Sequence, residues 1–487
     1  MQALSQKESG AYYTPDHVAS SLLLWAIRSL DDRLLDPSCG DGRFISSHRN
    51  SVGIEQDATA AQAAISRAPW ALVHEGDFFA WAANTTERFE CAAGNPPFIR
   101  YQTFKGDVRA LALQLCAHQG AQFSGLASSW APFLVATASL LKRGGRMAFV
   151  VPAEIGHAPY ATPLLEYLVS HFKVVHVVAV RDKLFADLSE DCWLLYTEGF
   201  GESTNEIRFT ALDSFKPLRA PPRRFQRIAL DDWRSWGNRL RPFLMSREVR
   251  QIYQGALAES TTRRFGDIAS IGIGYVTGAN DFFHLRPSEV RSWGIDDQWL
   301  HPTVRKGSAL PSKRLTQSMV DQWRRGDEQI LLLRIPKGAK LPSTVGRYLD
   351  SAAGHQAREA YKCRVRDPWY SVPDVQVPDF FLSYMSGLEP SLVRNEASCT
   401  CTNSVHSVRL KAKMSSSALL KGWESDFMRL SAEIEGHPLG GGMLKLEPRE
   451  ATRIVVPATS EIGRLSSPAV SAALSTMREW RHYAPAQ

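Results

Sequence analysis

The chain has 487 residues, 44% hydrophobic and 22% charged, which is enough for two or three globular domains. It contains no run of about 20 apolar residues and starts without the basic and apolar regions of a secretory signal, which argues against a membrane or secreted protein and predicts a cytoplasmic one. The seven cysteines indicate reduced thiols rather than disulfides. The close pair Cys399 and Cys401 lacks a second ligand pair, so no metal site is predicted.

The net charge of +7 is distributed unevenly along the chain. Residues 1–215 contain 17 Lys and Arg against 23 Asp and Glu, whereas residues 216–487 contain 40 against 27. A basic half suits a polyanion such as duplex DNA, because neutralised phosphates release condensed counterions. An Arg-rich surface in contact only with solvent would give the same balance, so charge alone leaves both interpretations open.

Short apolar segments alternate with helical ones between residues 34 and 198, a pattern that predicts an α/β domain with a mainly parallel sheet. An amphipathic helix over residues 17–30 precedes the first strand. Strands are predicted over residues 34–36, 52–55, 71–74, 91–93, 147–151 and 174–178, and helices over residues 59–66, 130–141 and 163–171. Residues 193–198 follow without a full crossover helix, so we expect them to add an antiparallel edge strand.

A proline- and arginine-rich stretch, residues 216–224, is typical of a linker or a first surface loop. It predicts the boundary between one domain at residues 1–215 and a second at residues 216–487. Periodicity weakens beyond it. Short apolar runs at residues 330–335 and 380–384 are separated by Pro, Gly and Ser, and a last helix is expected over residues 469–483. The second domain is therefore expected to be mixed α/β or irregular.

The first candidate ligand site is the sequence DPSCGDGRF at residues 36–44, where a strand runs into a glycine-containing turn. Such glycines let the backbone approach a ligand at the carboxyl edge of an open sheet, although a turn without a ligand would share the pattern. Glu55 and Asp77 end the next two strands. Glu55 suits the ribose hydroxyls of an adenosine-type ligand, and Asp77, beside Phe78, suits its adenine amino group; each acid could instead cap a helix or lie in solvent.

The second candidate site is the sequence Asn95-Pro96-Pro97-Phe98 at the end of the fourth predicted strand. An aromatic amine is a poor nucleophile, because its lone pair is delocalised into the ring, and two acceptors are needed to hold its hydrogens. Consecutive prolines restrict the backbone, so the Asn95 side-chain oxygen and the Pro96 carbonyl can be held toward one amino group. Phe98 can then stack on the base. A rigid turn without this role is the alternative.

These motifs resemble those of the amino-methyltransferases of DNA, in the gamma arrangement found among type II modification methylases that act on adenine N6. The resemblance covers residues 10–200 and implies a Rossmann-like class I methyltransferase fold that uses S-adenosyl-L-methionine. AYYTP at residues 11–15 resembles its N-terminal motif and NPPF its catalytic motif. KLFAD at residues 183–187 resembles a later motif whose aromatic residue packs on the flipped base. By this resemblance, the cofactor would contact Thr14, Asp36, Pro37, Cys39, Gly40, Glu55, Asp77, Phe78 and Asn95, and the base would contact Asn95, Pro96, Pro97, Phe98 and Phe185.

Three segments of the basic half, at residues 271–283, 362–370 and 401–410, resemble target-recognition regions of the same methylases. Two clusters there are candidate duplex-DNA contacts: Arg305, Lys306, Lys313 and Arg314, and Lys362, Arg364, Arg366, Trp369 and Tyr370. A solvated face or an interdomain contact is the alternative for either cluster. A separate restriction endonuclease would be the functional partner.

The motif order therefore predicts methyl transfer to the amine of an adenine rotated out of duplex DNA. No covalent enzyme intermediate is required, which fits the lack of the Pro-Cys motif used by cytosine carbon-5 enzymes. Cytosine N4 methylation is the nearest competing function, but Asn rather than Ser before the two prolines favours adenine. An enzyme that methylates RNA or protein amines, or a non-catalytic DNA-binding subunit, would share part of the same pattern.

Overall fold

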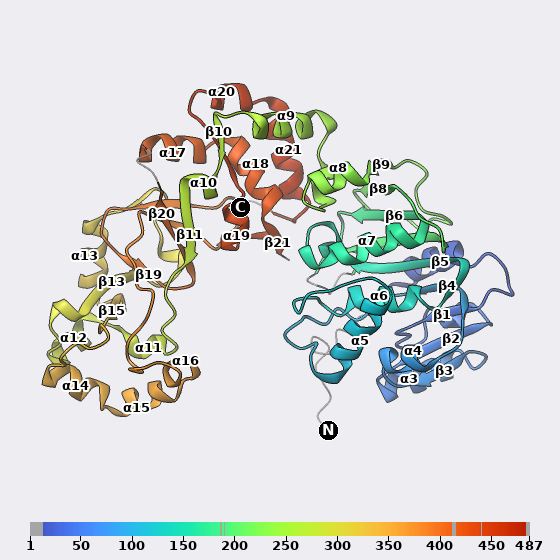
Figure 1. Ribbon diagram of the computed structural model, residues 1–487, viewed down its shortest axis with the longest axis horizontal. Helices are drawn as coiled ribbons and strands as arrows, with labels where there is room; N and C mark the ends of the chain where they lie inside the picture. The colour runs from blue at the N-terminus through green and yellow to red at the C-terminus, as the bar shows by residue number, and fades with distance from the viewer. Residues whose placement is uncertain (1–12, 186–187, 189, 412–414, 440, 484–487) are drawn as a thin grey trace. The chain divides into compact units, whose positions relative to one another are not determined.

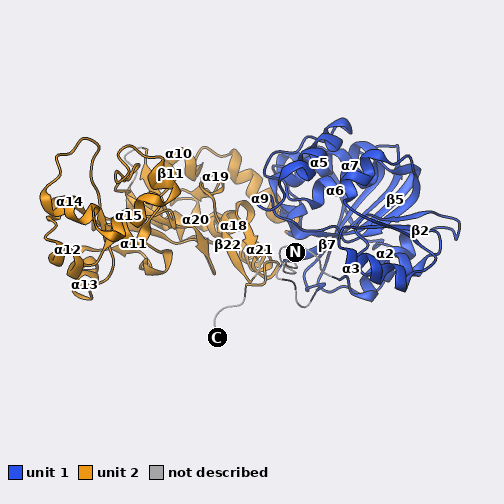
Figure 2. Ribbon diagram, turned by 90° about the horizontal axis from the view of Figure 1, so that it is seen from below, with its two compact units in different colours: residues 1–244 blue, residues 245–487 orange. Residues whose placement is uncertain are grey.

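The computed structural model describes residues 13–185, 188, 190–411, 415–439 and 441–483, and the chain forms two compact units, residues 1–244 and 245–487 (Figure 2). The division comes later than the boundary expected after residue 215, because residues 226–229 add a strand to the sheet of the first unit. With the observed division, the first unit contains 25 Lys and Arg against 25 Asp and Glu, and the second 32 against 25. Part of the predicted basic half thus belongs to the first unit.

The first unit is built on a sheet of nine strands among the described residues, in the order β3-β2-β1-β4-β5-β7-β6-β8-β9 (Figure 1). Within it, β7 and β9 run antiparallel to their neighbours and the other strands share one direction, which confirms the mainly parallel class I methyltransferase fold. The strands are β1 (Leu34–Asp36), β2 (Ser51–Glu55), β3 (Leu72–Glu75), β4 (Phe89–Gly94), β5 (Leu141–Pro152), β6 (Phe172–Val180), β7 (Cys192–Phe200), β8 (Glu206–Leu212) and β9 (Gln226–Ala229).

Helices cover both faces of this sheet, with α5 to α7 on one face and α2 and α3 on the other (Figure 2). The sequence did not predict the short helix α4 or α5, and it extended the first helix past its observed end at Ala26. The helices of this unit are α2 (Asp16–Ala26), α3 (Ala58–Arg67), α4 (Phe78–Asn84), α5 (Gly106–His118), α6 (Trp130–Ala138), α7 (Thr162–His171) and α8 (Leu230–Ser235).

The reversed strand predicted over residues 193–198 is present as β7, but it does not lie at the edge of the sheet. It pairs antiparallel with β5 on one side and β6 on the other. Its first six residues are buried, as expected for a strand with neighbours on both sides. The edge position is taken by β9 instead.

The second unit is mixed α/β, as expected. Its described strands form sheets in the orders β11-β20-β16-β18-β14, β12-β15-β13-β19, β17-β22-β21 and β10-β23. They are β10 (Thr262–Arg264), β11 (Ala269–Ile273), β12 (His284–Leu285), β13 (Leu300–Val304), β14 (Arg314–Leu315), β15 (Leu331–Leu333), β16 (Phe380–Ser383), β17 (Met385–Ser386), β18 (Leu392–Asn395), β19 (Thr400–Cys401), β20 (Val405–Leu410), β21 (His437–Leu439), β22 (Met443–Lys445) and β23 (Val455–Pro457).

The helices of the second unit pack around two apolar clusters, one containing Phe283 and Leu332 and the other Phe265 and Leu382. Among the described residues, no helix of the chain is long and apolar enough to cross a membrane. The helices are α9 (Arg247–Ala258), α10 (Phe265–Ile268), α11 (Asn280–Phe283), α12 (Pro287–Trp293), α13 (Gln317–Arg325), α14 (Ser343–Leu349), α15 (Ala352–Glu359), α16 (Tyr361–Arg364), α17 (Ser416–Trp423), α18 (Asp426–Glu435), α19 (Pro448–Ala451), α20 (Ile462–Leu465) and α21 (Pro468–Glu479).

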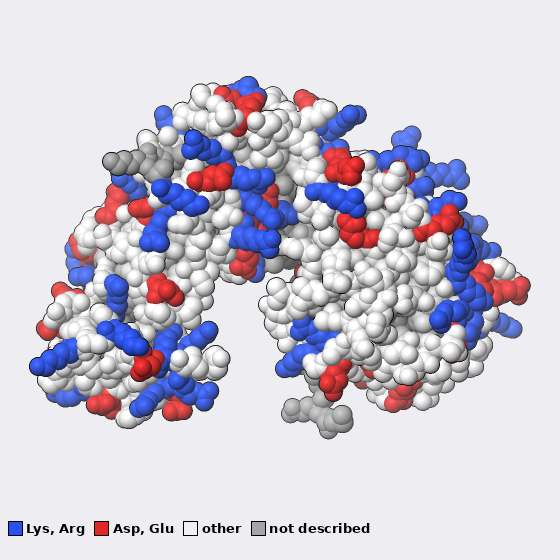
Figure 3. Space-filling view, viewed as in Figure 1, with Lys and Arg blue, Asp and Glu red and all other residues white. Residues whose placement is uncertain are grey.

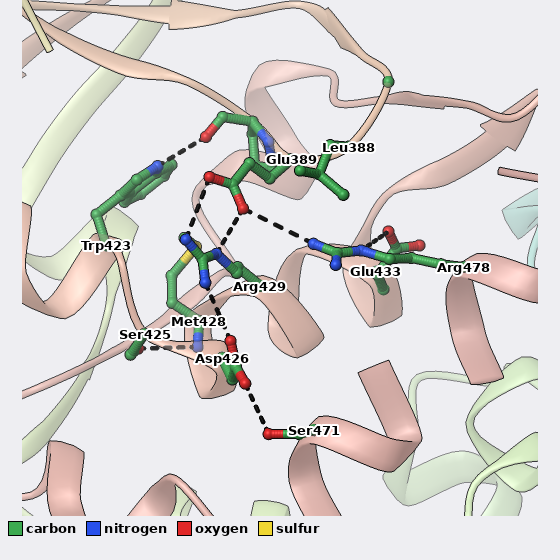
Figure 4. Close-up of polar contacts among 12 residues, drawn as sticks. Leu388, Glu389, Trp423, Ser425, Asp426, Met428, Arg429, Glu433, Ser471 and Arg478 are labelled. Carbon is green, nitrogen blue, oxygen red and sulfur yellow. Dashed lines mark hydrogen bonds and ion pairs between the residues drawn. The ribbon is translucent and has the colours of Figure 1, made fainter. Parts of the chain in front are cut away.

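A buried ionic network joins α18 to α21 and the residues that follow it. Figure 4 shows part of this network, in which Arg429 binds Glu389 and Asp426, and Asp426 accepts a hydrogen bond from Ser471 of α21. At its centre, the Arg481 guanidinium donates to the Glu433 carboxylate at 2.8–3.0 Å, and neither side chain is more than 2% exposed. Arg481, which follows α21, is therefore fixed to the core of the second unit.

Replacing Glu433 with Gln should destabilise the protein by about 3–5 kcal/mol, because it leaves a buried guanidinium without its counter-charge. Urea unfolding followed by tryptophan fluorescence measures the change. Glu424→Gln is the matched control, since Glu424 pairs with Lys313 at an exposed site and should change the free energy of unfolding by less than about 1 kcal/mol. Equal effects of the two substitutions would contradict this account of the network.

Candidate active site

Residues 36–44 leave β1 at the carboxyl edge of the sheet and fold tightly against β2 and α3. The Cys39 amide donates to the Ile54 carbonyl at 2.9 Å, and a Cβ added at Gly53 would lie 2.7 Å from the Cys39 sulfur. Gly42 has a φ of +87°, and a Cβ there would lie 2.9 Å from the Cα of Ala64. The glycines thus allow the backbone of the loop to lie directly on the neighbouring elements.

The Glu55 carboxylate at the end of β2 organises the start of this loop. One of its oxygens accepts the Gly40 amide at 2.9 Å, and the other accepts the Asp57 amide at 2.8 Å. Gly40 has a φ of +53°, in the left-handed region. The carboxylate that the sequence assigns to a ribose is therefore held in a fixed orientation beside the glycine turn.

Asp36, at the end of β1, is buried with 1% of its surface exposed. Its Oδ1 accepts the Ser38 amide at 3.2 Å, while its buried Oδ2 has no hydrogen-bond partner among the described residues. Burial raises the pKa of this carboxyl to about 8, and the nearby carboxylates of Glu55 and Asp41 add to the effect. This edge of the sheet therefore contains a buried carboxyl oxygen that a cationic ligand group could satisfy.

Two serine hydroxyls fix the Asn95-Pro96-Pro97-Phe98 segment, which follows β4. Ser38 donates to the Asn95 carbonyl at 3.0 Å, which joins this segment to the loop after β1. Ser129, just before α6, donates to the Pro97 carbonyl at 2.5 Å and accepts the Ile99 amide at 3.0 Å. The Asn95 Oδ1 atom is buried at this edge. The loops after β1 and β4 are thus joined by a hydrogen bond.

The predicted aromatic residues Phe98 and Phe185 are associated with the same apolar cluster. Phe185 lies in the connection between β6 and β7, is 6% exposed, and belongs to an apolar cluster against which the half-buried Phe98 packs. The last two residues of the later motif, 186 and 187, lie outside the described residues. The structure therefore places one aromatic residue from each motif in the same cluster.

Asp77 caps α4, which was the alternative interpretation for this acid. Its carboxylate accepts the Ala80 amide at 2.9 Å, and it follows β3 at the same edge as Asp36 and Glu55. The neighbouring Phe78 is buried and packs on Phe133 of α6, with ring centroids 4.4 Å apart. A capping carboxylate retains lone pairs for a further donor, so the two roles are compatible.

Arg43, for which the sequence predicted no role, fastens the N-terminal segment to the glycine loop. Its guanidinium donates to the Thr14 carbonyl at 3.0 Å, contacts the carboxylates of Asp16 and Asp41, and lies 5.5 Å from the centre of the Tyr13 ring. Thr14 is buried, and so is Pro37 in the glycine loop. Residues 11 and 12 of the N-terminal motif lie outside the described residues.

The predicted DNA contacts of the second unit differ in exposure. Lys306, Lys313, Arg314, Lys362 and Arg364 are exposed, although Lys313 forms an ion pair with Glu424. Basic and acidic side chains are interspersed over the face seen in Figure 3. These five residues are therefore accessible to a polyanion.

The remaining predicted contacts are engaged within the unit. Both terminal nitrogens of Arg366 donate to backbone carbonyls, those of Val276 and Thr277, so this arginine holds the segment after β11. Trp369 is half-buried with its ring 5.7 Å from that of Phe282, and it also packs on Tyr370. Arg305 pairs with Asp281 and Gln329. These side chains therefore bind other residues of the second unit.

Comparisons with known proteins identify similar chains along the whole sequence. The family profile described as the C-terminal domain of the type II methyltransferase M.Eco57I matches residues 238–482, about half of the chain, and that of the Eco57I restriction-modification methylase matches residues 43–185. The type II methyltransferase M.AccI of Acinetobacter calcoaceticus is 18% identical over 98% of this chain and 90% of its own length. M.XamI of Xanthomonas campestris pv. amaranthicola is 23% identical over 93% and 86%.

A solved structure with a similar fold is that of the type IIL restriction-modification enzyme MmeI in complex with DNA. It superposes with a TM-score of 0.59 at 11% identity, covering 99% of this chain and 76% of the other. At this identity the likeness concerns the fold alone.

Replacing Asp36 with Asn should stabilise the unliganded protein, more at pH 8 than at pH 5. A carboxyl with a folded pKa of about 8 is protonated in the fold but ionised in the unfolded chain at intermediate pH, so its contribution to stability falls as the pH rises from about 4 to 8. Thermal unfolding at both pH values measures the difference, at about 2–4 °C per kcal/mol. The exposed Asp31→Asn is the control. A gain that does not depend on pH would contradict the raised pKa.

Proposed function

The chain belongs to the Eco57I family of restriction-modification methylases, and we propose that it transfers a methyl group from S-adenosyl-L-methionine to N6 of an adenine rotated out of a specific site in duplex DNA. The observation that carries this proposal is the Asn95–Phe98 segment fixed by Ser38 to the loop that contains the buried Asp36 carboxyl. The recognised sequence would be read by the second unit.

The buried Oδ2 atom of Asp36 is an observation that fits this cofactor. It has no partner among the described residues, and the methionine ammonium group would supply the missing donors. We assign Glu55 to the ribose hydroxyls, Asp77 to the adenine amine, and Thr14 to the methionine carboxylate. The rest of the assigned lining consists of Pro37, Cys39, Gly40, Phe78 and Asn95. When bound, the cofactor supplies an electrophilic methyl group on a sulfonium.

The Asn95–Phe98 segment would prepare the target amine for attack. The Asn95 oxygen and the Pro96 carbonyl would accept its two hydrogens, which directs the nitrogen lone pair toward the methyl carbon. Phe98 and Phe185 would bind the faces of the base, and Pro97, held by Ser129, would keep the segment rigid. Direct displacement requires no covalent enzyme intermediate, so the positioning of the two reactants would supply most of the rate enhancement.

The second unit would provide most of the DNA contacts. Its net charge of +7 suits a polyanion, and we assign phosphate or base contacts to its exposed cations Lys306, Lys313, Arg314, Lys362 and Arg364. Arg305, Arg366, Trp369 and Tyr370 would act by shaping that surface. A separate restriction endonuclease would cut the unmodified site.

Asn95→Ala should reduce the methylation rate at least about 100-fold, because it removes one of the two acceptors for the amine. Cofactor labelled in the methyl group, genomic DNA as substrate and nucleoside mass spectrometry measure both the rate and the modified base. Asn84→Ala, at the exposed end of α4, is the control and should retain the parent rate.

Label in N6-methyladenine supports the proposal, and label in N4-methylcytosine would replace adenine by cytosine as the target base. Label found only in RNA or protein would overturn DNA as the substrate. An Asn95→Ala protein that is as fast as the parent would overturn the assigned catalytic segment.

Ser129→Ala should lower kcat about tenfold with little change in cofactor affinity, because it releases the Pro97 carbonyl and the Ile99 amide without altering the glycine loop. Steady-state methylation and cofactor titration measure the two effects. Ser139→Ala is a control near the other end of α6, where the hydroxyl bonds only the Ala136 carbonyl among its described contacts. A fall in cofactor affinity without a fall in kcat would show that Ser129 acts elsewhere.

A further inference from the structure

The connection between β8 and β9, residues 213–225, starts at the same sheet edge as the candidate active site. β8 runs parallel to β6, and β6 has the same direction as β5, β4 and β1. The carboxyl end of β8 at Leu212 therefore lies at the edge that presents Asp36 and Asn95. In the sheet order, β8 is four strands from β4, which at the usual spacing is about 19 Å.

This connection is fixed to the body of the first unit. The Leu218 amide donates to Ser21 of α2 at 3.2 Å, and the Phe215 ring lies 5.9 Å from that of His17. At its far end, the Arg224 carbonyl accepts the Thr210 hydroxyl at 3.1 Å. Three prolines, Pro217, Pro221 and Pro222, restrict the backbone between these anchors. Of the two interpretations that its composition allowed, a linker or a surface loop, the segment is therefore a surface loop, and it belongs to the first unit.

The surface of this segment is basic. Residues 216–227, which extend from this connection into β9, contain five Lys and Arg and no acidic residue. By contrast, the first 215 residues of the chain contain six more acidic than basic residues. The five cations are exposed: Lys216, Arg219, Arg223, Arg224 and Arg227. Figure 3 shows basic side chains gathered over the end of the first unit where β8 and β9 lie.

Two of the nearby acids are already paired. Asp213 binds Arg181 at 3.3 Å, and Glu206 binds Arg227 at 2.8 Å. Phe225 is covered by the guanidinium groups of Arg208 and Arg227, at 4.8 and 5.4 Å from its ring centre. In the described structure, the side chains of Lys216, Arg219, Arg223 and Arg224 have no ion pair. These four cations are available to an external anion.

We propose that residues 216–227 bind backbone phosphates of the duplex beside the target base, as a DNA contact of the catalytic unit itself. The inference rests on the proposed function. About 19 Å of duplex carries on the order of ten phosphates, so a duplex whose target base is at Asn95 can extend to this surface. The segment reads no sequence: exposed arginines on an anchored, proline-restricted loop bind phosphates at little ordering cost.

The test compares two double variants of the full chain that each lose two exposed arginines. In Arg223→Gln/Arg224→Gln, the slope of log affinity against log salt for a duplex without target sites should fall by about 1–2, because each lost phosphate contact contributes about 0.9. The control is Arg49→Gln/Arg88→Gln, exposed residues that precede β2 and β4 at the opposite edge of the sheet, and it should keep the parent slope. Fluorescence anisotropy between 50 and 200 mM salt measures it.

The outcomes distinguish the two proposals. A parent protein that methylates DNA while the Arg223/Arg224 variant keeps the parent slope would overturn the phosphate surface and leave the proposed function standing. Equal losses in both variants would also overturn it, since they would indicate a general effect of charge. A slope that depends on these arginines in a protein that methylates no DNA would support the surface and overturn the proposed function. Unchanged cofactor affinity in both variants verifies that the first unit remains folded.

Discussion

The close approach of β1 and β4 at their carboxyl ends is the constraint on which the candidate site depends. A Cβ at Gly94 would lie 2.6 Å from the Asp36 carboxylate, so the last residue of β4 must be glycine for the two strand ends to meet. This contact brings the loop after β1 within reach of the loop after β4, and the Ser38 hydroxyl then joins them. The same approach excludes water from Asp36 and raises its pKa. The close approach thus contributes to both the geometry and the electrostatics of this edge.

Local features of the first unit could be predicted from the sequence because they depend on neighbouring residues. Apolar runs predicted each strand from β1 to β7, and the strand-turn-glycine pattern located Asp36, Gly40 and Glu55 at one edge. The interior position of β7 could not be predicted, because strand order depends on pairing between distant segments. Arg43 and Ser129 were missed for the same reason: their partners, Thr14 and Pro97, lie 29 and 32 residues away. The assignments of individual site residues stay predictions.

The second unit shows why basic composition is an incomplete guide to a DNA-binding surface. Arg366 was a candidate contact, yet its guanidinium binds two carbonyl groups of its own unit. Arg481 is fully buried against Glu433. Arginine has five donors in a planar group, so it also satisfies backbone carbonyls and buried carboxylates inside a domain. Conversely, the prolines and arginines of residues 216–224 left a linker and a surface loop equally open, and the segment is a surface loop of the first unit.

The insertion of β7 between β5 and β6 determines the direction of the connection between β6 and β7, which contains Phe185. If β6 had paired directly with β5, the chain leaving β6 would have turned outward, toward the free end of the sheet. With β7 inserted, the chain must instead return inward across the sheet edge to reach β5, and Phe185 lies on that return path. One exchange of strand order thereby carries an aromatic ring back to the apolar cluster that Phe98 contacts. The position of Phe185 in this cluster therefore depends on the order of the strands and not on the length of the connection between β6 and β7.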